Sequence, residues 1–336
     1  MVAETPVAGI PKIMTSTIRF SSAKELRVRL NIVVAAALAG MAALPAHALD
    51  WSKVPGRDVV MFYPGQTSWE WNLTEADHSA AAKFKAGKNC IECHKGEEKT
   101  QGALLASGKK AEPAPISMFP GHVTASIRFA YDDAKLYVRL EFAEPSAPDA
   151  KMDPDFATKV AMIFNDAAVP EGVRSGCWAS CHEDNASMPA AAGSTRTKYL
   201  MKTRAKMSRA GGGDALKPAD DLAKLTEAGY AQEWWQVKLN PGAAPQSSGG
   251  MIFDARQEQK PAVIASEASF ANGIWSVVMS RPLDAPAPYK ALTPGKTYTV
   301  GFSVHLGHSA KRFHHTSYEY TFALGQGSAD IVAVKQ

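Results

Sequence analysis

Four cysteines occur in the 336-residue chain, and they form two closely spaced pairs. In the motifs CIECH and CWASCH, a histidine directly follows the second cysteine. The C-x-x-C-H pattern is typical of c-type haem attachment, in which two thiols bond covalently to the haem and the histidine binds its iron. The two motifs therefore predict two haem c groups, although CWASCH has one extra residue between its cysteines. The predicted attachment residues and proximal ligands are Cys90, Cys93 and His94 for the first haem, and Cys177, Cys181 and His182 for the second.

Three other chemistries use paired cysteines. In an exported protein the pairs could be disulfides of a ligand-binding sandwich domain. They could also act in a thiol oxidoreductase, but such enzymes have a βαβ context that the flanks of Cys90 lack. Zinc is a third alternative, and the separation between Cys93 and Cys177 is far outside common zinc-site spacings. Haem attachment is therefore the favoured interpretation of both motifs.

The distal ligand of the first haem is predicted from local sequence. His78 lies twelve residues before Cys90, and residues 80–85 favour a helix that could fold back over the haem. We therefore expect His78 to bind the iron opposite His94. A histidine on the protein surface is the alternative.

For the second haem, the distal ligand is expected among later residues. His314 and His315 lie in a segment with strand character, and adjacent strand residues point to opposite faces, so only one of them can reach a given iron. We expect His314, with His315 or Met188 as alternatives. Met188 follows His182 closely and would require a tight chain reversal. Further candidates are His122, His305 and His308.

Residues 1–48 have the features of a secretory signal peptide. Lys24, Arg27 and Arg29 precede an apolar run over residues 30–44, and a small-residue cleavage signal ends at Ala48. We expect removal of this segment after general secretory export to the periplasm, leaving no membrane span. A retained anchor is the alternative, but the run is shorter than the roughly 20 residues that cross a bilayer.

Composition limits the class of partner. The chain is 46% hydrophobic and 21% charged, which indicates a folded protein. Its formal net charge of +4 is too small to favour nucleic-acid binding, which usually needs a concentrated basic face.

The elements that position these motifs are mainly strands. Residues 49–112 show little strand periodicity and predict a small helix-and-loop module for the first haem. Residues 113–336 contain short alternating segments separated by turn residues, which predict an antiparallel β-sandwich. An insertion at about 168–232 would carry the second haem. The expected strands are 125–131, 136–142, 159–164, 233–239, 274–280, 297–305 and 316–324, with turns at 132–133 and 272–273 and a helix over 219–228.

The sequence resembles the haem-binding subunits of ethylbenzene-dehydrogenase and dimethyl-sulfoxide-reductase-type molybdoenzymes. The resemblance covers about residues 113–325 and rests on residues 177–184, 272–277, 281–283 and 312–318. Residues 64–71 with Asp77 and His78 are similar to the c-type module of dihaem cytochromes. The resemblance implies an immunoglobulin-like β-sandwich that passes electrons to or from a catalytic partner. Some members hold haem b through Met and Lys, and those ligands do not transfer to a covalent-attachment motif.

We therefore expect a periplasmic dihaem c-type cytochrome that relays electrons and is not itself an enzyme. Its partners would be a quinol-side donor or a terminal oxidoreductase, such as a molybdoenzyme. The alternative function is a haem enzyme, for instance a dihaem peroxidase or a sulfur-compound oxidase, which would need a five-coordinate iron.

Overall fold

The computed structural model describes residues 49–180, 199–206 and 215–336. The predicted signal peptide at residues 1–48 lies outside the described residues, as do Cys181, His182 and Met188. Within the described residues, Leu49–Gln336 forms one compact unit.

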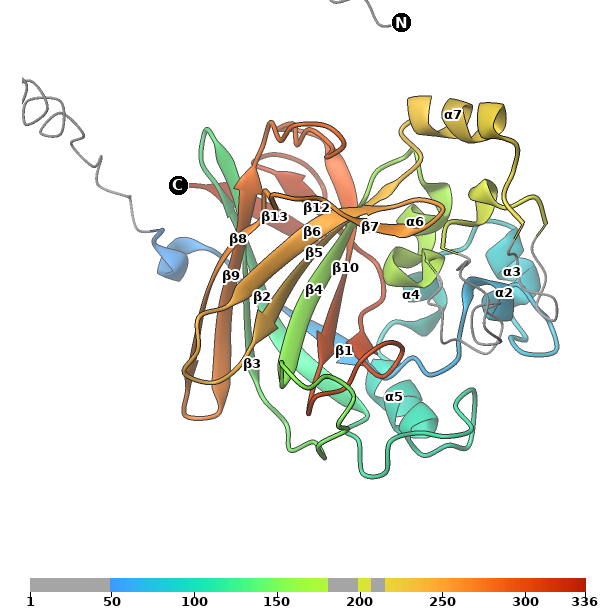
Figure 1. Ribbon diagram of the computed structural model, residues 1–336, viewed down its shortest axis with the longest axis horizontal. Coiled ribbons are helices and arrows are strands. Elements are labelled where there is room, and N and C mark those ends of the chain that lie inside the picture. Colours follow the sequence, from blue (N-terminus) through green and yellow to red (C-terminus); the bar gives the residue numbers. More distant parts are fainter. Residues whose placement is uncertain (1–48, 181–198, 207–214) are drawn as a thin grey trace, which may run out of the picture. The chain divides into compact units, whose positions relative to one another are not determined.

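Thirteen strands in the described part of the chain join in one continuous sheet (Figure 1). The sheet order is β7-β6-β5-β4-β10-β11-β1-β2-β3-β9-β8, and β12 and β13 bridge β10 and β2. The strands are β1 (Arg57–Phe62), β2 (His122–Tyr131), β3 (Lys135–Ala143), β4 (Thr158–Asn165), β5 (Gln232–Leu239), β6 (Gln246–Ile252), β7 (Arg256–Glu258), β8 (Ala265–Ala271), β9 (Ile274–Pro282), β10 (Thr297–His305), β11 (His315–Thr316), β12 (Tyr320–Leu324) and β13 (Ile331–Lys335).

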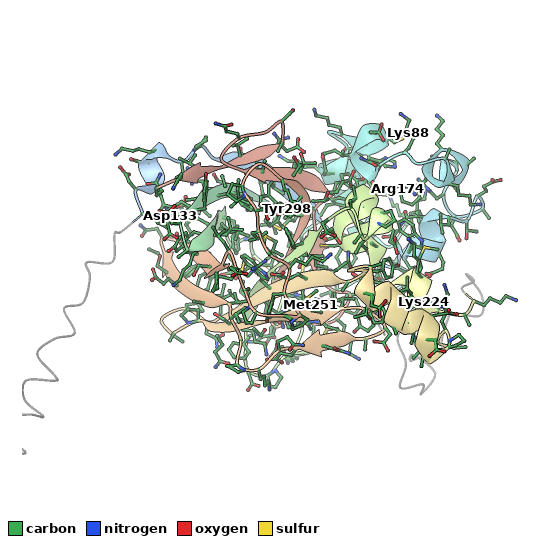
Figure 2. All side chains as sticks on the ribbon, turned by 90° about the horizontal axis from the view of Figure 1, so that it is seen from above. Lys88, Asp133, Arg174, Lys224, Met251 and Tyr298 are labelled. Carbon is green, nitrogen blue, oxygen red and sulfur yellow. The ribbon has the colours of Figure 1, made fainter. Side chains whose placement is uncertain are left out.

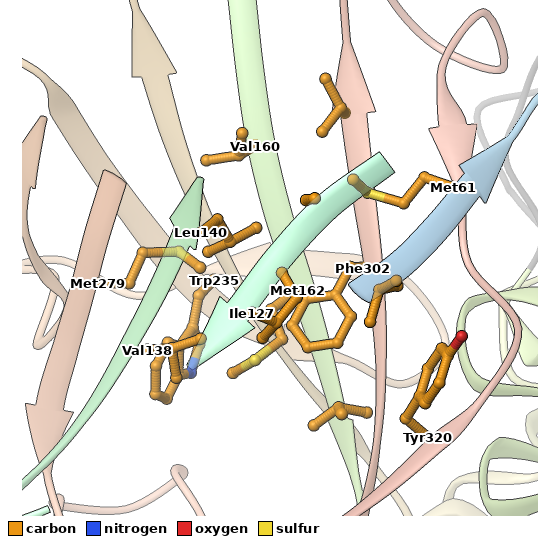
Figure 3. Packing of buried hydrophobic residues seen from close by; sticks show 14 of the residues in the cluster. Met61, Ile127, Val138, Leu140, Val160, Met162, Trp235, Met279, Phe302 and Tyr320 are labelled. Carbon is orange, nitrogen blue, oxygen red and sulfur yellow. The ribbon is translucent and has the colours of Figure 1, made fainter. Parts of the chain in front are cut away.

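The sheet folds back on itself, so that β2, β3 and β9 face β4, β5 and β10 across an apolar core (Figures 1 and 3). The expected mainly β sandwich is thereby confirmed. Its pairings are antiparallel except for β12–β13 and β13–β2, which are parallel. Strand β13 therefore ties the two layers together at one end.

Alternating side chains give strands such as β3 and β9 one buried face. In β3, Leu136, Val138 and Leu140 are fully buried while the intervening residues are partly exposed. They meet Val160 of β4 and other apolar side chains of the facing layer in the same cluster. Each such buried side chain stabilises the fold by about 1.5–3 kcal/mol relative to an exposed one.

The turn at residues 272–273 fixes the register of the β8–β9 hairpin. Asn272 and Gly273 both have positive φ angles, 52° and 76°. Two consecutive residues of this kind form the turn whose twist matches that of paired strands. Ala271 pairs directly with Ile274 as a result.

The six α-helices of the described residues gather beside one end of the sandwich (Figure 1). Four of them come from the N-terminal segment, and α6 and α7 lie in the connection between β4 and β5, where the sequence predicts an insertion. The helices are α2 (Trp69–Asn72), α3 (Ala81–Lys85), α4 (Cys90–His94), α5 (Glu98–Ala106), α6 (Pro170–Ser175) and α7 (Ala219–Glu227), together with the 3-10 helices η1 (Trp51–Lys53), η2 (Gly176–Ala179) and η4 (Met201–Thr203).

The N-terminal segment differs from the expected helix-and-loop module in one respect. It contributes β1, which pairs with β2 over six residues and also contacts β11. Three apolar residues of this strand, Val59, Met61 and Phe62, are buried. The strand was not predicted because its six residues, RDVVMF, lack a clear two-residue alternation.

Candidate functional site

The first cysteine motif forms helix α4. Asn89 caps the helix, and the Glu92 carboxylate accepts a hydrogen bond from the Asn89 backbone N–H at 2.7 Å. This capping box fixes the start of a helix that is otherwise only five residues long. Residues three and four apart share one helix face. The single turn therefore presents Cys90, Cys93 and His94 to the same side.

That side faces a cavity, which encloses about 910 Å³ with its open mouth included. Cys90, Cys93, His94 and the predicted distal ligand His78 all line it. Its apolar walls include Phe62, Trp71, Phe84, Leu104, Leu105, Trp178 and Tyr318.

His78 reaches the cavity because the chain folds back through α2 and α3. Its Nδ1 lies 2.9 Å from the Asn72 carbonyl oxygen, which can only accept, so Nδ1 carries the proton. Its ring stacks against Trp71 at 5.8 Å and lies edge-to-face with Phe84 of α3. The other ring nitrogen, Nε2, is thus left with the lone pair that a metal requires.

The rings of His78 and His94 have their centres 6.0 Å apart. Two metal–imidazole bonds of about 2 Å each would occupy most of that distance. The rest of the distance between the ring centres is taken up by the two rings themselves, from each bonded nitrogen to the centre of its ring. The separation therefore suits two histidines that share one metal ion between them.

An arginine from the β4–β5 connection secures the fold-back. Arg174 of α6 donates to the backbone carbonyl oxygens of Phe84 and Lys88, and its guanidinium lies 4.7 Å from the centre of the Phe84 ring. Figure 2 shows Arg174 and Lys88 at the same end of the molecule, opposite Asp133. The two segments that carry the cysteine motifs are thus joined directly.

Two residues near the C-terminus complete the first site, although sequence reasoning did not single them out. Tyr318 stacks on His94 with ring centres 5.9 Å apart and 17° between the planes. Glu319 accepts a hydrogen bond from the Ile91 backbone N–H at 2.9 Å, which holds the first turn of α4. Only Thr316 and Ser317 separate them from His315, and this closeness in the sequence was the signal that could have identified them.

The environment of Cys90 disfavours thiol–disulfide chemistry. Burial, together with the nearby Glu319 carboxylate, raises the pKa of the Cys90 thiol well above its usual value. Redox-active cysteines need the opposite, a lowered pKa that yields the thiolate. Cys90, Cys93 and Cys177 are each free of disulfide bonds.

The second motif begins on η2, against strand β10. A Cβ atom at Gly301 of β10 would lie only 2.7 Å from the Cys177 sulfur, so the close approach of η2 depends on this glycine. Burial raises the pKa of the Cys177 thiol to about 11. Cys181 and His182 lie outside the described residues, so the rest of this motif stays a prediction.

A second cavity, about 390 Å³ with its mouth included, contains Cys177 and His314 in its lining. The Nδ1 atom of His314 lies 2.9 Å from the Lys311 carbonyl oxygen, which can only accept, so Nδ1 carries the ring proton in this contact. His314 also stacks on His305 at 4.9 Å. The structure thus brings His314 to the same cavity as Cys177, and its role as the distal ligand of a second haem stays a prediction.

His315 points elsewhere, as strand alternation predicts. It is fully buried, stacks on Phe119 at 5.1 Å, and its Nε2 lies 2.6 Å from the Pro120 carbonyl oxygen. Burial lowers the pKa of His315 to about 4, so the ring stays neutral. It lines neither of the two cavities, whereas His314 lines the second.

The two cavities share part of their walls. Thr67 and Trp178 line both of them. Trp178 also packs against Phe62 at 5.5 Å and Tyr318 at 6.4 Å. A continuous set of aromatic rings therefore runs from the second cavity to His94.

Among the described side chains, no group of three or more His, Cys, Asp or Glu is arranged to hold a metal ion by itself. No helix within the same residues is long and apolar enough to cross a membrane.

Comparison with known proteins finds two close relatives. Cytochrome c-552 of Stutzerimonas stutzeri is 32% identical over 298 residues, which cover 88% of this chain and 93% of that protein. Cytochrome c-551 of Rhodocyclus tenuis is 29% identical over 291 residues, which cover 85% of this chain and 99% of that protein.

Among solved structures, a family 9 carbohydrate-binding module from Caldicellulosiruptor kristjanssonii in complex with cellotriose is 12% identical, with a TM-score of 0.28. The match covers 59% of this chain and 65% of that one, a likeness too low to support an argument. The family model described as ethylbenzene dehydrogenase matches residues 51–317. This match confirms the family that the sequence resembles: the chain belongs to the ethylbenzene dehydrogenase family.

Proposed function

We propose that the chain is a periplasmic dihaem c-type cytochrome that relays electrons between a donor and a terminal oxidoreductase. The observation that carries the proposal is the first cavity, where two thiols and two histidine rings converge. The names of the relatives from Stutzerimonas and Rhodocyclus, both cytochromes c, support the same class of cofactor.

The residues of the first cavity fit haem c. Cys90 and Cys93 would hold the group covalently, and His94 and His78 would bind its iron. Bound there, the haem would supply a site for reversible one-electron transfer. The chain's own contribution is to orient both imidazoles through their Nδ1 atoms and to enclose the group in apolar walls.

A second haem is supported by the cavity at Cys177. Cys177 and Cys181 would attach it, His182 would be the proximal ligand, and His314 the distal one. Because Thr67 and Trp178 line both cavities, the two haems would lie next to one another. That arrangement suits a relay, in which an electron enters at one centre and leaves at the other.

Full coordination of both irons by these histidines would favour electron relay over catalysis. Two protein ligands on each iron leave no position for a substrate. The partners would be a quinol-side donor and a terminal reductase or dehydrogenase, reached in the periplasm after removal of residues 1–48.

The proposal is tested on the mature protein produced with a c-type haem assembly system. A pyridine haemochrome assay should give two covalent haems per chain, and low-temperature electron paramagnetic resonance should show two low-spin irons. His78→Ala and His314→Ala should each convert one haem to high spin. His122→Ala serves as the control, because His122 lines neither cavity.

Absence of covalent haem would refute the proposal outright. A high-spin signal in the resting wild-type protein, with turnover of peroxide or thiosulfate, would replace the electron carrier with a haem enzyme. Low-spin spectra in both histidine variants would show that the distal ligands are other residues.

A further inference from the structure

The two histidines of the first cavity have different partners at Nδ1. His78 donates to a neutral acceptor, the backbone carbonyl of Asn72, at 2.9 Å. His94 instead has a carboxylate oxygen, Oε2 of Glu97, at 2.9 Å from its Nδ1. The side chain of Gln101 also lies at this Nδ1, with its amide nitrogen 2.8 Å away.

Of these two neighbours of His94 Nδ1, only the Glu97 carboxylate can accept a hydrogen bond from it. The amide nitrogen of Gln101 is a donor, and its own oxygen already accepts from the Tyr318 hydroxyl at 2.7 Å. When Nε2 of His94 binds a metal, Nδ1 must carry the ring proton. The hydrogen bond therefore runs from His94 to Glu97.

Glu97 is held in place for this role. Gln101 donates to Glu97 Oε2 at 3.0 Å, and Tyr318 orients Gln101 while stacking on the His94 ring. Helix α5, which carries Gln101, is itself fixed against the sheet: a Cβ at Gly102 would come within 2.1 Å of the Gly121 carbonyl oxygen. The carboxylate thus belongs to a network anchored in two distant parts of the chain.

We propose that Glu97 is a positioning residue that makes His94 the more electron-donating of the two axial ligands and so lowers the reduction potential of the first haem. The proposal rests on the proposed function, since it requires haem c at this motif. A hydrogen bond to a carboxylate strengthens the basicity of a ligating imidazole more than one to a neutral carbonyl. More electron density at the iron stabilises its oxidised form, which lowers the potential.

The test is a redox titration of the mature holoprotein, followed optically and by electron paramagnetic resonance, with Glu97→Gln. The variant retains an acceptor for His94 but removes the charge. We expect the reduction equilibrium of the first haem to shift about tenfold toward the reduced form, equivalent to about 59 mV for a one-electron couple. The iron should remain low-spin, so that the shift reflects ligand character and not ligand loss.

Glu92→Gln is the matched control. Glu92 lies on helix α4 with His94 and carries the same charge as Glu97, but its carboxylate bonds to Lys88 and the Asn89 backbone and to neither histidine. Its glutamine variant preserves the capping box. A potential shift in Glu97→Gln clearly larger than in Glu92→Gln supports the proposal, and equal shifts or none overturn it.

Gln101→Leu provides a second measurement if Glu97→Gln fails to retain haem. It leaves the carboxylate in the chain but removes the amide that holds it. We expect a smaller shift in the same direction, and an unchanged potential would contradict the proposed role. Wild-type protein without covalent haem would refute the proposed function itself, and this is established before any variant is titrated.

Discussion

Glu319 makes the stability of the protein depend on pH in a direction opposite to most carboxylates. The side chain is only 4% exposed, and its Oε2 has no hydrogen-bond partner among the described residues. Burial raises its pKa from 4.5 to about 7. A raised pKa means that the folded state binds the proton more tightly than the unfolded state does.

The sign of the effect follows directly. The stabilisation from the protonated carboxyl is fully present below pH 4.5 and is lost as the pH rises through about 7. At 1.36 kcal/mol per unit of pKa, the loss amounts to about 3 kcal/mol at pH 8. Glu319→Gln removes the titration but keeps an acceptor for the Ile91 N–H, so the variant should be more stable than wild type by about that amount at pH 8.

The assay is urea unfolding of the mature holoprotein followed by far-ultraviolet circular dichroism, at pH 5 and pH 8. The advantage of Glu319→Gln should be small at pH 5 and should develop between pH 5 and pH 7. Glu267→Gln, at an exposed position of the edge strand β8, should show no such trend. An advantage that is the same at both pH values, or a variant less stable at pH 8, would refute the reasoning.

Two further substitutions test packing and buried charge. Gly301→Ala places a methyl group against the Cys177 sulfur, and urea unfolding should show a loss of about 1–3 kcal/mol of stability. A pyridine haemochrome assay should show less haem attached at the second motif. Normal stability and normal haem content would contradict the tight contact. Arg281→Met leaves the fully buried Glu233 carboxylate without its ion-pair partner at 2.7 Å, and urea unfolding at pH 7 should show a loss of about 3–5 kcal/mol. A loss below 1 kcal/mol would mean that Glu233 is satisfied by other groups.

Sequence periodicity predicted most of the sandwich. The segments expected at 125–131, 136–142, 159–164, 233–239 and 274–280 correspond to β2, β3, β4, β5 and β9, and 297–305 matches β10. Strands β3 and β9 alternate because one face is buried, whereas β4 and β5 are buried on both faces. The segment expected at 316–324 is divided between β11 and β12, and strands such as β6, with its small residues QSSGGMI, carry too little apolar contrast to be recognised.

The sequence predicted those residues of the first site that lie close together in the chain. Cys90, Cys93 and His94 lie within one turn, and His78 is brought back by a short helix. Tyr318 and Glu97 were not predicted. Tyr318 arrives from the far end of the chain through strand pairing, and nothing in the composition around Glu97 distinguishes it from a surface carboxylate.

Strand β1 has a consequence for how the protein can be divided. The predicted boundary near residue 112 would separate the two cysteine motifs, yet β1 precedes it and is paired on both sides with later strands. A fragment that begins at residue 113 would leave the backbone of β2 at 122–127 unpaired on the side where β1 lies, and such open edges favour association between chains. We therefore expect that residues 113–336, which carry the second motif, do not fold without the N-terminal segment that carries the first. In evolution the two segments would then be inherited as one unit.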